Sequence, residues 1–172
     1  MQVAKFIEVA SAFEGVPCKN LFFKAKKAKQ CVDPPCIPRR VMPPTPRRCT
    51  LLPPCRDGDS RMWLVILRHD TTLNMKDLAS QLGYGKVVIR FGDAKSLLEN
   101  LGTAQGHVSP FALVNDTKLV VQVAVDAAIV AGGETPFLFH PLVNEASVGL
   151  TGDALGTFVQ RTGHTFVTVQ GE

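Results

Sequence analysis

The sequence predicts an α+β domain built on a mixed, curved, barrel-like sheet of about seven short strands flanked by helices. Strand-length apolar runs alternate with capped helical segments over residues 62–101, and turn-separated strand pairs dominate over residues 106–150. The chain has 172 residues, of which 45% are hydrophobic. This length suffices for one domain with a real core and is too short for two. We therefore expect residues 1–172 to form a single domain.

Composition narrows the class of protein. No apolar run approaches the roughly 18 residues of a membrane span, and the first residues lack the features of a secretory signal peptide. We expect a cytoplasmic protein with no membrane partner. A net charge of +4 gives modest support for a nucleic-acid partner. Five cysteines, an odd number in a chain without a secretory signal, argue against a disulfide framework.

The first part of the chain predicts a short amphipathic helix over residues 4–13 and a strand over residues 21–23. Lys19, just before this strand, begins one of its two rows of side chains. Two interpretations stay open for Lys19: a charge that reaches water along its apolar stem, or a lysine at the mouth of a pocket. Further lysines then form a solvated basic turn. Period-two alternation assigns Lys19, Leu21 and Phe23 to one face, and Asn20, Phe22 and Lys24 to the other.

Residues 31–60 differ from the rest of the chain, because they hold eight of its twelve prolines, four of its five cysteines and two arginine pairs. Such proline density removes backbone donors and excludes both helix and central strand. We predict a disordered, polyproline-like insertion. A zinc site, an SH3-type ligand and a set of phosphate contacts are the alternatives. The spacing C-x4-C-x12-C-x5-C is wider than the paired cysteines of common zinc sites, so no metal is expected.

The middle of the chain predicts alternating strands and helices. Residues 62–68 form an apolar run suited to a strand buried on both faces, and residues 86–91 form a second strand. A helix over residues 75–82 has Asn74 as its N-cap and ends at Gly83, and a helix over residues 94–101 follows Asp93 and ends at Gly102.

The last third predicts hairpins and two candidate functional segments. Residues 111–114 and 119–125 read as paired strands around a turn, and residues 127–130 as a helical turn. An aromatic strand ends at His140, which is followed by a turn with Asn144 and a strand over residues 146–150. A helix over residues 153–161, capped by Thr151, and a strand over residues 165–169 close the chain. His140 either borders a pocket or caps a turn structurally.

Three segments in this order resemble the YbaK/prolyl-tRNA synthetase-associated domain family: KNLF (residues 19–22), GHVSPFALVND (106–116), and FHPLVN (139–144) continuing to SVGL (147–150). The resemblance covers residues 15–30 and 62–170, and it is closest to the freestanding members. It implies a barrel-like mixed sheet with flanking helices. It also implies an enzyme, an aminoacyl-tRNA deacylase that acts in trans on mischarged tRNA, mainly alanine on the proline tRNA, without a cofactor.

The resemblance also assigns roles by position. Lys19 and His140 match the residues expected at the catalytic site. The lysines of the basic region are expected to contact the acceptor end of the tRNA, and a transient association with the translation machinery follows from that partner. Expected substrate-binding residues are Asn20, Gly106, His107, Val108, Ser109, Pro110 and Asn144, and expected tRNA-binding residues are Lys24, Lys26, Lys27 and Lys29.

The chemistry requires no side-chain nucleophile, because the ester is already activated and the free hydroxyl of the ribose can assist the water. Loop backbone groups can orient the α-amine or stabilise the oxyanion. Cys18, beside Lys19, is a minor candidate nucleophile. The alternatives are a deacylase for another amino acid, such as cysteine on the proline tRNA, and a catalytically silent tRNA-binding or scaffold protein of the same fold.

Overall fold

The structure of the protein is a computed structural model, which describes residues 14–25, 61–84, 89–143 and 145–171. The expected helix over residues 4–13, the insertion over residues 31–60, and Lys26, Lys27, Lys29 and Asn144 lie outside the described residues. The elements in chain order are β1 (Val16–Ala25), β2 (Met62–Arg68), α2 (Met75–Gln81), β3 (Ile89–Phe91), α3 (Ala94–Leu101), the 3-10 helix η1 (Pro110–Asn115), β4 (Val121–Asp126), α4 (Ala127–Val130), β5 (Phe137–Phe139), β6 (Val148–Leu150), α5 (Gly152–Arg161) and β7 (Phe166–Val169).

The strands form one seven-stranded sheet in the order β6-β5-β1-β2-β4-β7, with β3 paired to β1 outside this path. Three pairs are antiparallel (β1–β2, β1–β3 and β5–β6), and three are parallel (β1–β5, β2–β4 and β4–β7). The predicted mixed α+β sheet is confirmed. The sheet ends in β6 and β7 and does not close into a barrel.

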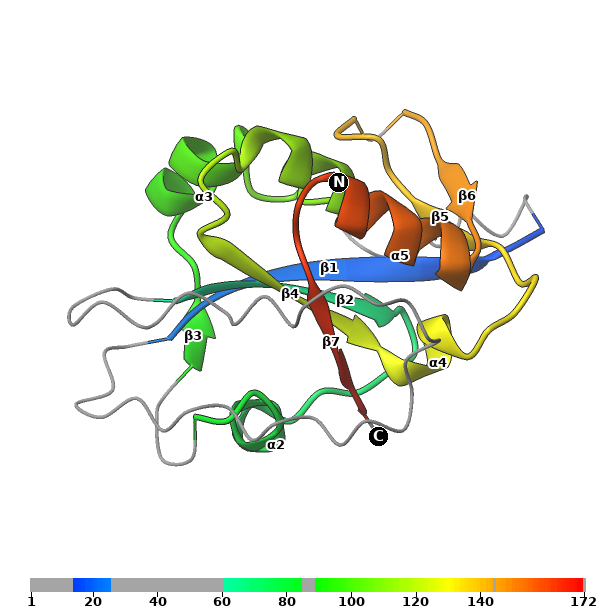
Figure 1. Ribbon diagram of the computed structural model, residues 1–172, viewed down its shortest axis with the longest axis horizontal. Coiled ribbons are helices and arrows are strands. Elements are labelled where there is room, and N and C mark those ends of the chain that lie inside the picture. The colour runs from blue at the N-terminus through cyan, green and yellow to red at the C-terminus, as the bar shows by residue number, and fades with distance from the viewer. Residues whose placement is uncertain (1–13, 26–60, 85–88, 144, 172) are drawn as a thin grey trace, which may run out of the picture.

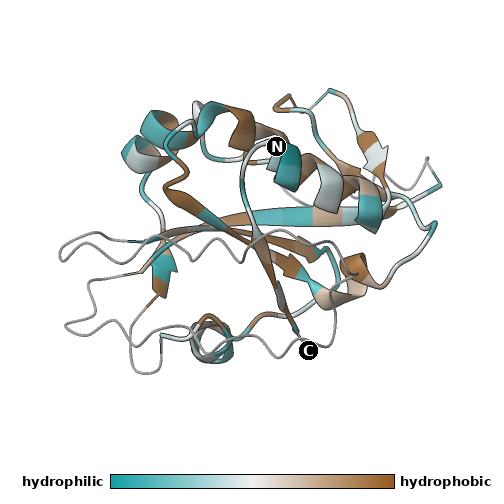
Figure 2. Ribbon diagram, in the orientation of Figure 1, coloured by the Kyte–Doolittle hydropathy of each residue, from teal (hydrophilic) through white to brown (hydrophobic). Residues whose placement is uncertain are grey.

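Helices cover both faces of the sheet. Figure 1 shows α3 and α5 on one face and α2 on the other. On the first face lies the α3/α5 core, which includes Phe22, Ile66, Leu97, Phe139 and Leu155. On the second face lies the α2 core, which includes Phe23, Trp63, Val65, Leu67 and Leu78. In Figure 2 the hydrophobic colour is strong on β4, whereas β1 and the helices carry both hydrophobic and hydrophilic residues.

Local sequence chemistry sets the helix ends as expected. The side chain of Asn74 accepts a hydrogen bond from the backbone N–H of Lys76, and Asp93 and Thr151 cap α3 and α5 in the same way. Gly102 ends α3 with a φ of 62°, a conformation that glycine adopts without steric cost. These capping predictions are confirmed.

The strand expected over residues 111–114 is wrong, because these residues form η1. A four-residue apolar run does not by itself distinguish strand from helix. Pro110 at the first position presets the helical φ, and Ala112 and Leu113 are buried in the α3/α5 core. The expected hairpin is therefore absent, and β4 pairs in parallel with β2 and β7 instead.

Candidate functional site

The site residues predicted in the first motif lie in the middle of β1, the longest strand. Phe22 packs in the α3/α5 core, whereas Leu21 and Phe23 pack with the α2 core. The predicted alternation of faces is confirmed. Lys19 and Asn20 therefore direct their side chains to opposite faces of the sheet, although they are neighbours in sequence.

The ammonium group of Lys19 is held by the loop that follows β2. Its Nζ donates hydrogen bonds to the carbonyl oxygens of Thr71 at 2.5 Å and His69 at 3.2 Å. An ammonium group has three N–H donors, so these two bonds leave one for another partner. This arrangement gives Lys19 a structural anchor that the sequence did not predict, together with one remaining donor.

Asp126 supports this loop and is a residue that the sequence prediction missed. Its Oδ2 accepts a hydrogen bond from the hydroxyl of Thr71 at 2.6 Å, and its Oδ1 accepts one from the backbone N–H of Ala128 at 3.0 Å. The carboxylate is thus both the N-cap of α4 and the support of the residue that holds Lys19. An acidic residue directly after a buried apolar strand was the available sequence signal.

The predicted substrate loop, residues 106–110, is fixed between α3 and η1. The hydroxyl of Thr103 donates to the carbonyl of His107 at 3.1 Å, and the backbone N–H of His107 donates to the carbonyl of Ala104 at 3.1 Å. Gly106 has a φ of 87°, which glycine tolerates. Val108, Ser109 and Pro110 are buried, so the loop is well anchored and suited to holding backbone groups in fixed positions.

His140 follows β5 and lies against this loop. Burial lowers the pKa of His140, the charge of nearby His107 lowers it further, and a hydrogen bond with the backbone of Val108 opposes both effects. The imidazole is therefore predominantly neutral at neutral pH. The parallel pairing of β5 with β1 ends with Leu138 opposite Pro17, two residues before His140.

Two buried polar atoms near this loop have no hydrogen-bond partner among the described residues. They are Oδ1 of Asn20 and Oγ of Ser109. Asn20 lies between Cys18 and Phe22 on the face of β1 that carries the α3/α5 core, and Val108, beside Ser109, belongs to that core. A buried polar atom without a partner costs free energy unless water or a ligand satisfies it. These two atoms are therefore candidate contacts for a polar group of a ligand.

Cys18 is unsuited to the role of nucleophile. Its side chain is 5% exposed and belongs to the α3/α5 core. Burial raises the pKa of the Cys18 thiol, the charge of Asp126 raises it further, and the charge of Arg68 only partly opposes this. Because the thiolate is the reactive form, the Cys18 thiol is inert near neutral pH.

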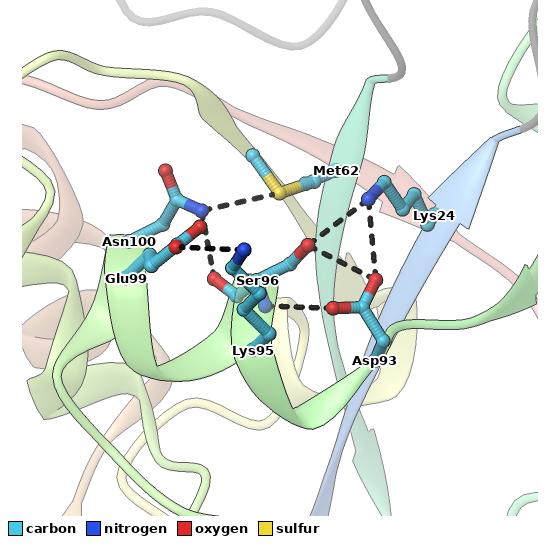
Figure 3. A network of polar contacts seen from close by, with 7 residues as sticks. All are labelled: Lys24, Met62, Asp93, Lys95, Ser96, Glu99 and Asn100. Carbon is cyan, nitrogen blue, oxygen red and sulfur yellow. Dashed lines mark hydrogen bonds and ion pairs between the residues drawn. The ribbon is translucent and has the colours of Figure 1, made fainter.

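Lys24, a predicted tRNA contact, lies in a network at the start of α3 (Figure 3). Its Nζ lies 3.2 Å from Oδ2 of Asp93 and donates to Oγ of Ser96 at 3.0 Å. Ser96 in turn donates its backbone N–H to Oδ1 of Asp93 at 2.8 Å. The pair between Lys24 and Asp93 is exposed, so another anion can compete for this lysine at little cost.

The described residues were also searched for metal-binding clusters, membrane-spanning helices and cavities away from β1. Within residues 14–25, 61–84, 89–143 and 145–171, no group of three or more His, Cys, Asp or Glu side chains could hold a metal ion. No helix in that part of the chain is long and apolar enough to cross a membrane. A hollow of about 270 Å³ lies between α2 and Gln170, on the face opposite to Asn20.

Comparisons with known proteins identify the family of this chain. Residues 54–158 match the family model of the aminoacyl-tRNA editing domain, which is more than half of the chain. A solved structure from work on epitope backbone grafting by computational design on scaffold proteins has a TM-score of 0.58 and 15% identity. That match covers 97% of this chain and 80% of the other, and it shows similarity of fold alone.

Sequence relatives carry related names. Prolyl-tRNA synthetase associated domain-containing protein 1 of Bos taurus is 42% identical over 102 residues, and that of Xenopus laevis is 41% identical over 103. The chain spans about 60% of the length of these relatives, and the matches cover 59% and 60% of this chain. Prolyl-tRNA editing protein ProX of Acetoanaerobium sticklandii is 31% identical over 116 residues, which is 67% of this chain and 68% of ProX. The chain therefore belongs to the YbaK-like family of aminoacyl-tRNA editing domains.

Proposed function

We propose that this protein is a trans-editing deacylase that hydrolyses the ester of mischarged aminoacyl-tRNA, with alanine on the proline tRNA as its preferred substrate. The observation that carries the proposal is the combination of Asn20, on the α3/α5 side of β1, with Lys19, which is anchored on the opposite face. Buried polar atoms without partners, Oδ1 of Asn20 and Oγ of Ser109, lie on the side of the anchored 106–110 loop and His140. The family membership and the name of the relative ProX support the same chemistry.

The reaction needs the 3′ end of the tRNA, a bound aminoacyl group and one water. The remaining N–H donor of Lys19 binds a ribose or phosphate oxygen, and the 106–110 loop orients the aminoacyl group. Water adds to the ester carbonyl carbon, the bond from that carbon to the ribose oxygen breaks, and a proton passes from the water to the ribose oxygen. The products are a free amino acid and uncharged tRNA. The free ribose hydroxyl and the predominantly neutral His140 are the candidate groups for this proton transfer.

Two other functions remain as candidates. The enzyme alternative is the same reaction on cysteine attached to the proline tRNA. The binding alternative is a silent tRNA-binding or scaffold protein that uses Lys24, Lys26, Lys27 and Lys29. The cytoplasm and a transient association with the translation machinery are the proposed setting in either case.

The test is hydrolysis of alanyl-, cysteinyl- and prolyl-tRNA carrying the proline tRNA, by this chain and by a version lacking residues 31–60. We expect both proteins to release alanine selectively. Binding without hydrolysis by either protein would favour the silent function. Activity of the shortened version alone would mean that residues 31–60 suppress the reaction.

A matched pair of lysine variants separates hydrolysis from RNA binding. Lys19→Ala removes a charged donor, and a lost hydrogen bond of about 1.5–3 kcal/mol corresponds to a fall of roughly 10- to 100-fold in kcat/KM. Lys24→Ala should instead weaken tRNA affinity and reduce its dependence on salt, with the rate for bound substrate retained. Equal effects of both variants on the rate for bound substrate would contradict these assignments.

A further inference from the structure

The carboxyl ends of three strands meet at the edge of the sheet where Lys19 is anchored. β2 pairs in parallel with β4, and β4 pairs in parallel with β7. Parallel neighbours run in the same direction, so the segments that follow them leave the sheet at the same edge. In Figure 1 the chain runs from β7 toward the α2 side of the sheet. The residues after β7 therefore lie near the loop after β2, whose carbonyls bind Lys19.

The backbone of Gln170 is held by the side chain of Gln81, the last residue of α2. Nε2 of Gln81 donates a hydrogen bond to the Gln170 carbonyl at 2.8 Å, and Oε1 of Gln81 accepts one from the Gln170 N–H at 2.7 Å. A primary amide offers a donor and an acceptor together, so one side chain binds both backbone groups of Gln170. Val169, directly before it, is 1% exposed in the α2 core. The chain after β7 is therefore fixed against α2.

Gly171 packs on the loop after β2 with no room for a side chain. A Cβ atom at Gly171 would lie 2.7 Å from the carbonyl oxygen of Thr72 and closer still to Cγ2 of Thr71, and real Cβ atoms essentially never approach within 3.0 Å. The methyl group of Thr71 cannot rotate away freely, because the hydroxyl on the same carbon donates to Asp126 at 2.6 Å. The contact with Gly171 therefore fixes the backbone of Thr71 and Thr72.

The same residue, Thr71, carries the carbonyl that accepts the 2.5 Å hydrogen bond from Nζ of Lys19. Any displacement of the Thr71 backbone therefore acts directly on the ammonium group. Asp126 holds the Thr71 side chain from the end of β4, and Gly171 supports its backbone from the end of β7. Two segments that are distant in sequence thus determine the position of one carbonyl.

We propose that Gly171 is a positioning residue for Lys19. Gln81 holds Gln170, the adjoining Gly171 supports Thr71, and the Thr71 carbonyl fixes the ammonium group of Lys19. We call this arrangement the Gln81–Gly171 clamp. Its effect on hydrolysis rests on the proposed deacylase function, whereas its effect on the Lys19 side chain does not.

The first variant, Gly171→Ala, pushes Thr71 and Thr72 with a single methyl group. A misplacement on the order of 1 Å can cost about 10²-fold in rate, so we expect the single-turnover rate with bound alanyl-tRNA to fall roughly 10- to 100-fold. The affinity for tRNA should stay within about threefold, because the change is in orientation and not in charge. Gly156→Ala, whose Cβ meets only the ring of Phe166 at 3.5 Å, is the control and should retain the rate. An unchanged rate for Gly171→Ala in an active enzyme would overturn the inference.

A double variant distinguishes positioning from a general loss of stability. Gln81→Ala removes both hydrogen bonds to Gln170, so the residues after β7 can move away from the loop. In Gln81→Ala/Gly171→Ala the added methyl group should no longer displace Thr71, and the rate should recover by roughly threefold or more relative to Gly171→Ala. Independent losses of stability would instead add, and the double variant would then be the slowest of the three. That order of rates would overturn the inference.

A chemical measurement on Lys19 separates this inference from the proposed function. The probe is acetic anhydride at a low dose on the full chain, with peptide mass spectrometry to compare Lys19 with the exposed Lys118. Lys19 must give up a hydrogen bond to a carbonyl before its amine can be acylated. We expect Gly171→Ala to raise the labelling of Lys19 relative to Lys118 by about threefold or more, and the double variant to label less than Gly171→Ala.

The outcomes of the two measurements are distinct. If the wild type hydrolyses no aminoacyl-tRNA but Gly171→Ala exposes Lys19 to acylation, the hydrolase function fails and the Gln81–Gly171 clamp stands. Equal labelling of Lys19 in the wild type and in Gly171→Ala would overturn the inference. If circular dichroism shows that Gly171→Ala does not fold, Gln81→Ala provides the test, because the loss of support for Thr71 should still raise the labelling of Lys19. Unchanged labelling in Gln81→Ala would then overturn the inference.

Discussion

Asp116 is the residue whose replacement should destabilise the fold most clearly. It is 3% exposed and joins the turn after η1 to the turn after α5. Its Oδ1 accepts a hydrogen bond from the N–H of Val120 at 3.1 Å, and its Oδ2 accepts one from Val121 at 2.7 Å. The Nε2 of His164 lies 3.2 Å from Oδ2. Asp116→Asn keeps one oxygen and points an amide N–H₂ group at donors that had been satisfied.

The magnitude follows from the bonds lost. Hydrogen bonds to a charged group contribute about 1.5–3 kcal/mol each, and Asp116→Asn disrupts two of the three. We therefore expect the free energy of unfolding to fall by roughly 3–4 kcal/mol, a large part of the total of about 5–15 kcal/mol. With an m-value of about 2 kcal/mol/M, the urea midpoint falls by roughly 1.5–2 M.

The assay is urea unfolding followed by circular dichroism, with Glu134→Gln, an exposed carboxylate, as the control. The control should change the free energy of unfolding by less than about 0.5 kcal/mol. A fall of less than about 1 kcal/mol in the free energy of unfolding for Asp116→Asn would show that these hydrogen bonds do not stabilise the fold as reasoned.

The same residue gives a pH dependence with a definite sign. Burial alone would raise the pKa of Asp116, but hydrogen bonds from His164, Val121 and Val120 lower the pKa below its ordinary value of 3.8. A carboxyl group with a lowered folded-state pKa contributes stability above pH 3.8 and loses it as the pH falls through the folded-state pKa. The difference in the free energy of unfolding between the wild type and Asp116→Asn should therefore become smaller as the pH falls below 3.8.

Three further predictions concern the site and its surroundings. Gly92→Ala places a Cβ against the ring of Phe22, which is buried, and should cost about 1–3 kcal/mol of unfolding free energy. Gly156→Ala meets only the ring of Phe166 at 3.5 Å, an ordinary van der Waals distance, and should not destabilise α5. Cys18 should resist alkylation in the folded protein and react in urea, as followed by mass spectrometry of its peptide, and rapid labelling of the native protein would contradict its burial. Because the pKa of His140 is lowered, folding favours the neutral imidazole, so stability is full above the ordinary value of 6.5 and falls as the pH drops below it. His140→Gln should reduce that loss between pH 7.5 and pH 5, and an unchanged loss would argue against the lowered pKa.

Much of the candidate site was predictable because its residues occur in short segments. The alternation of Lys19 and Asn20, the anchored loop over residues 106–110 and the strand before His140 each depend on residues a few positions apart. Asp126 was missed because its partner Thr71 is distant in sequence, and only the parallel pairing of β2 with β4 brings that carboxylate close to Thr71.

The sequence by itself determined the helix ends and the two faces of β1. Asn74, Asp93, Gly102 and Thr151 act on backbone groups within four residues, so local chemistry is sufficient there. The packed chain alone sets the 3-10 helix over residues 110–115 and the pairing of β1 with β2, β3 and β5. Strand pairing and the burial of a short apolar run depend on segments that are distant in sequence. Their free energy comes from contacts that exist only once the chain is packed.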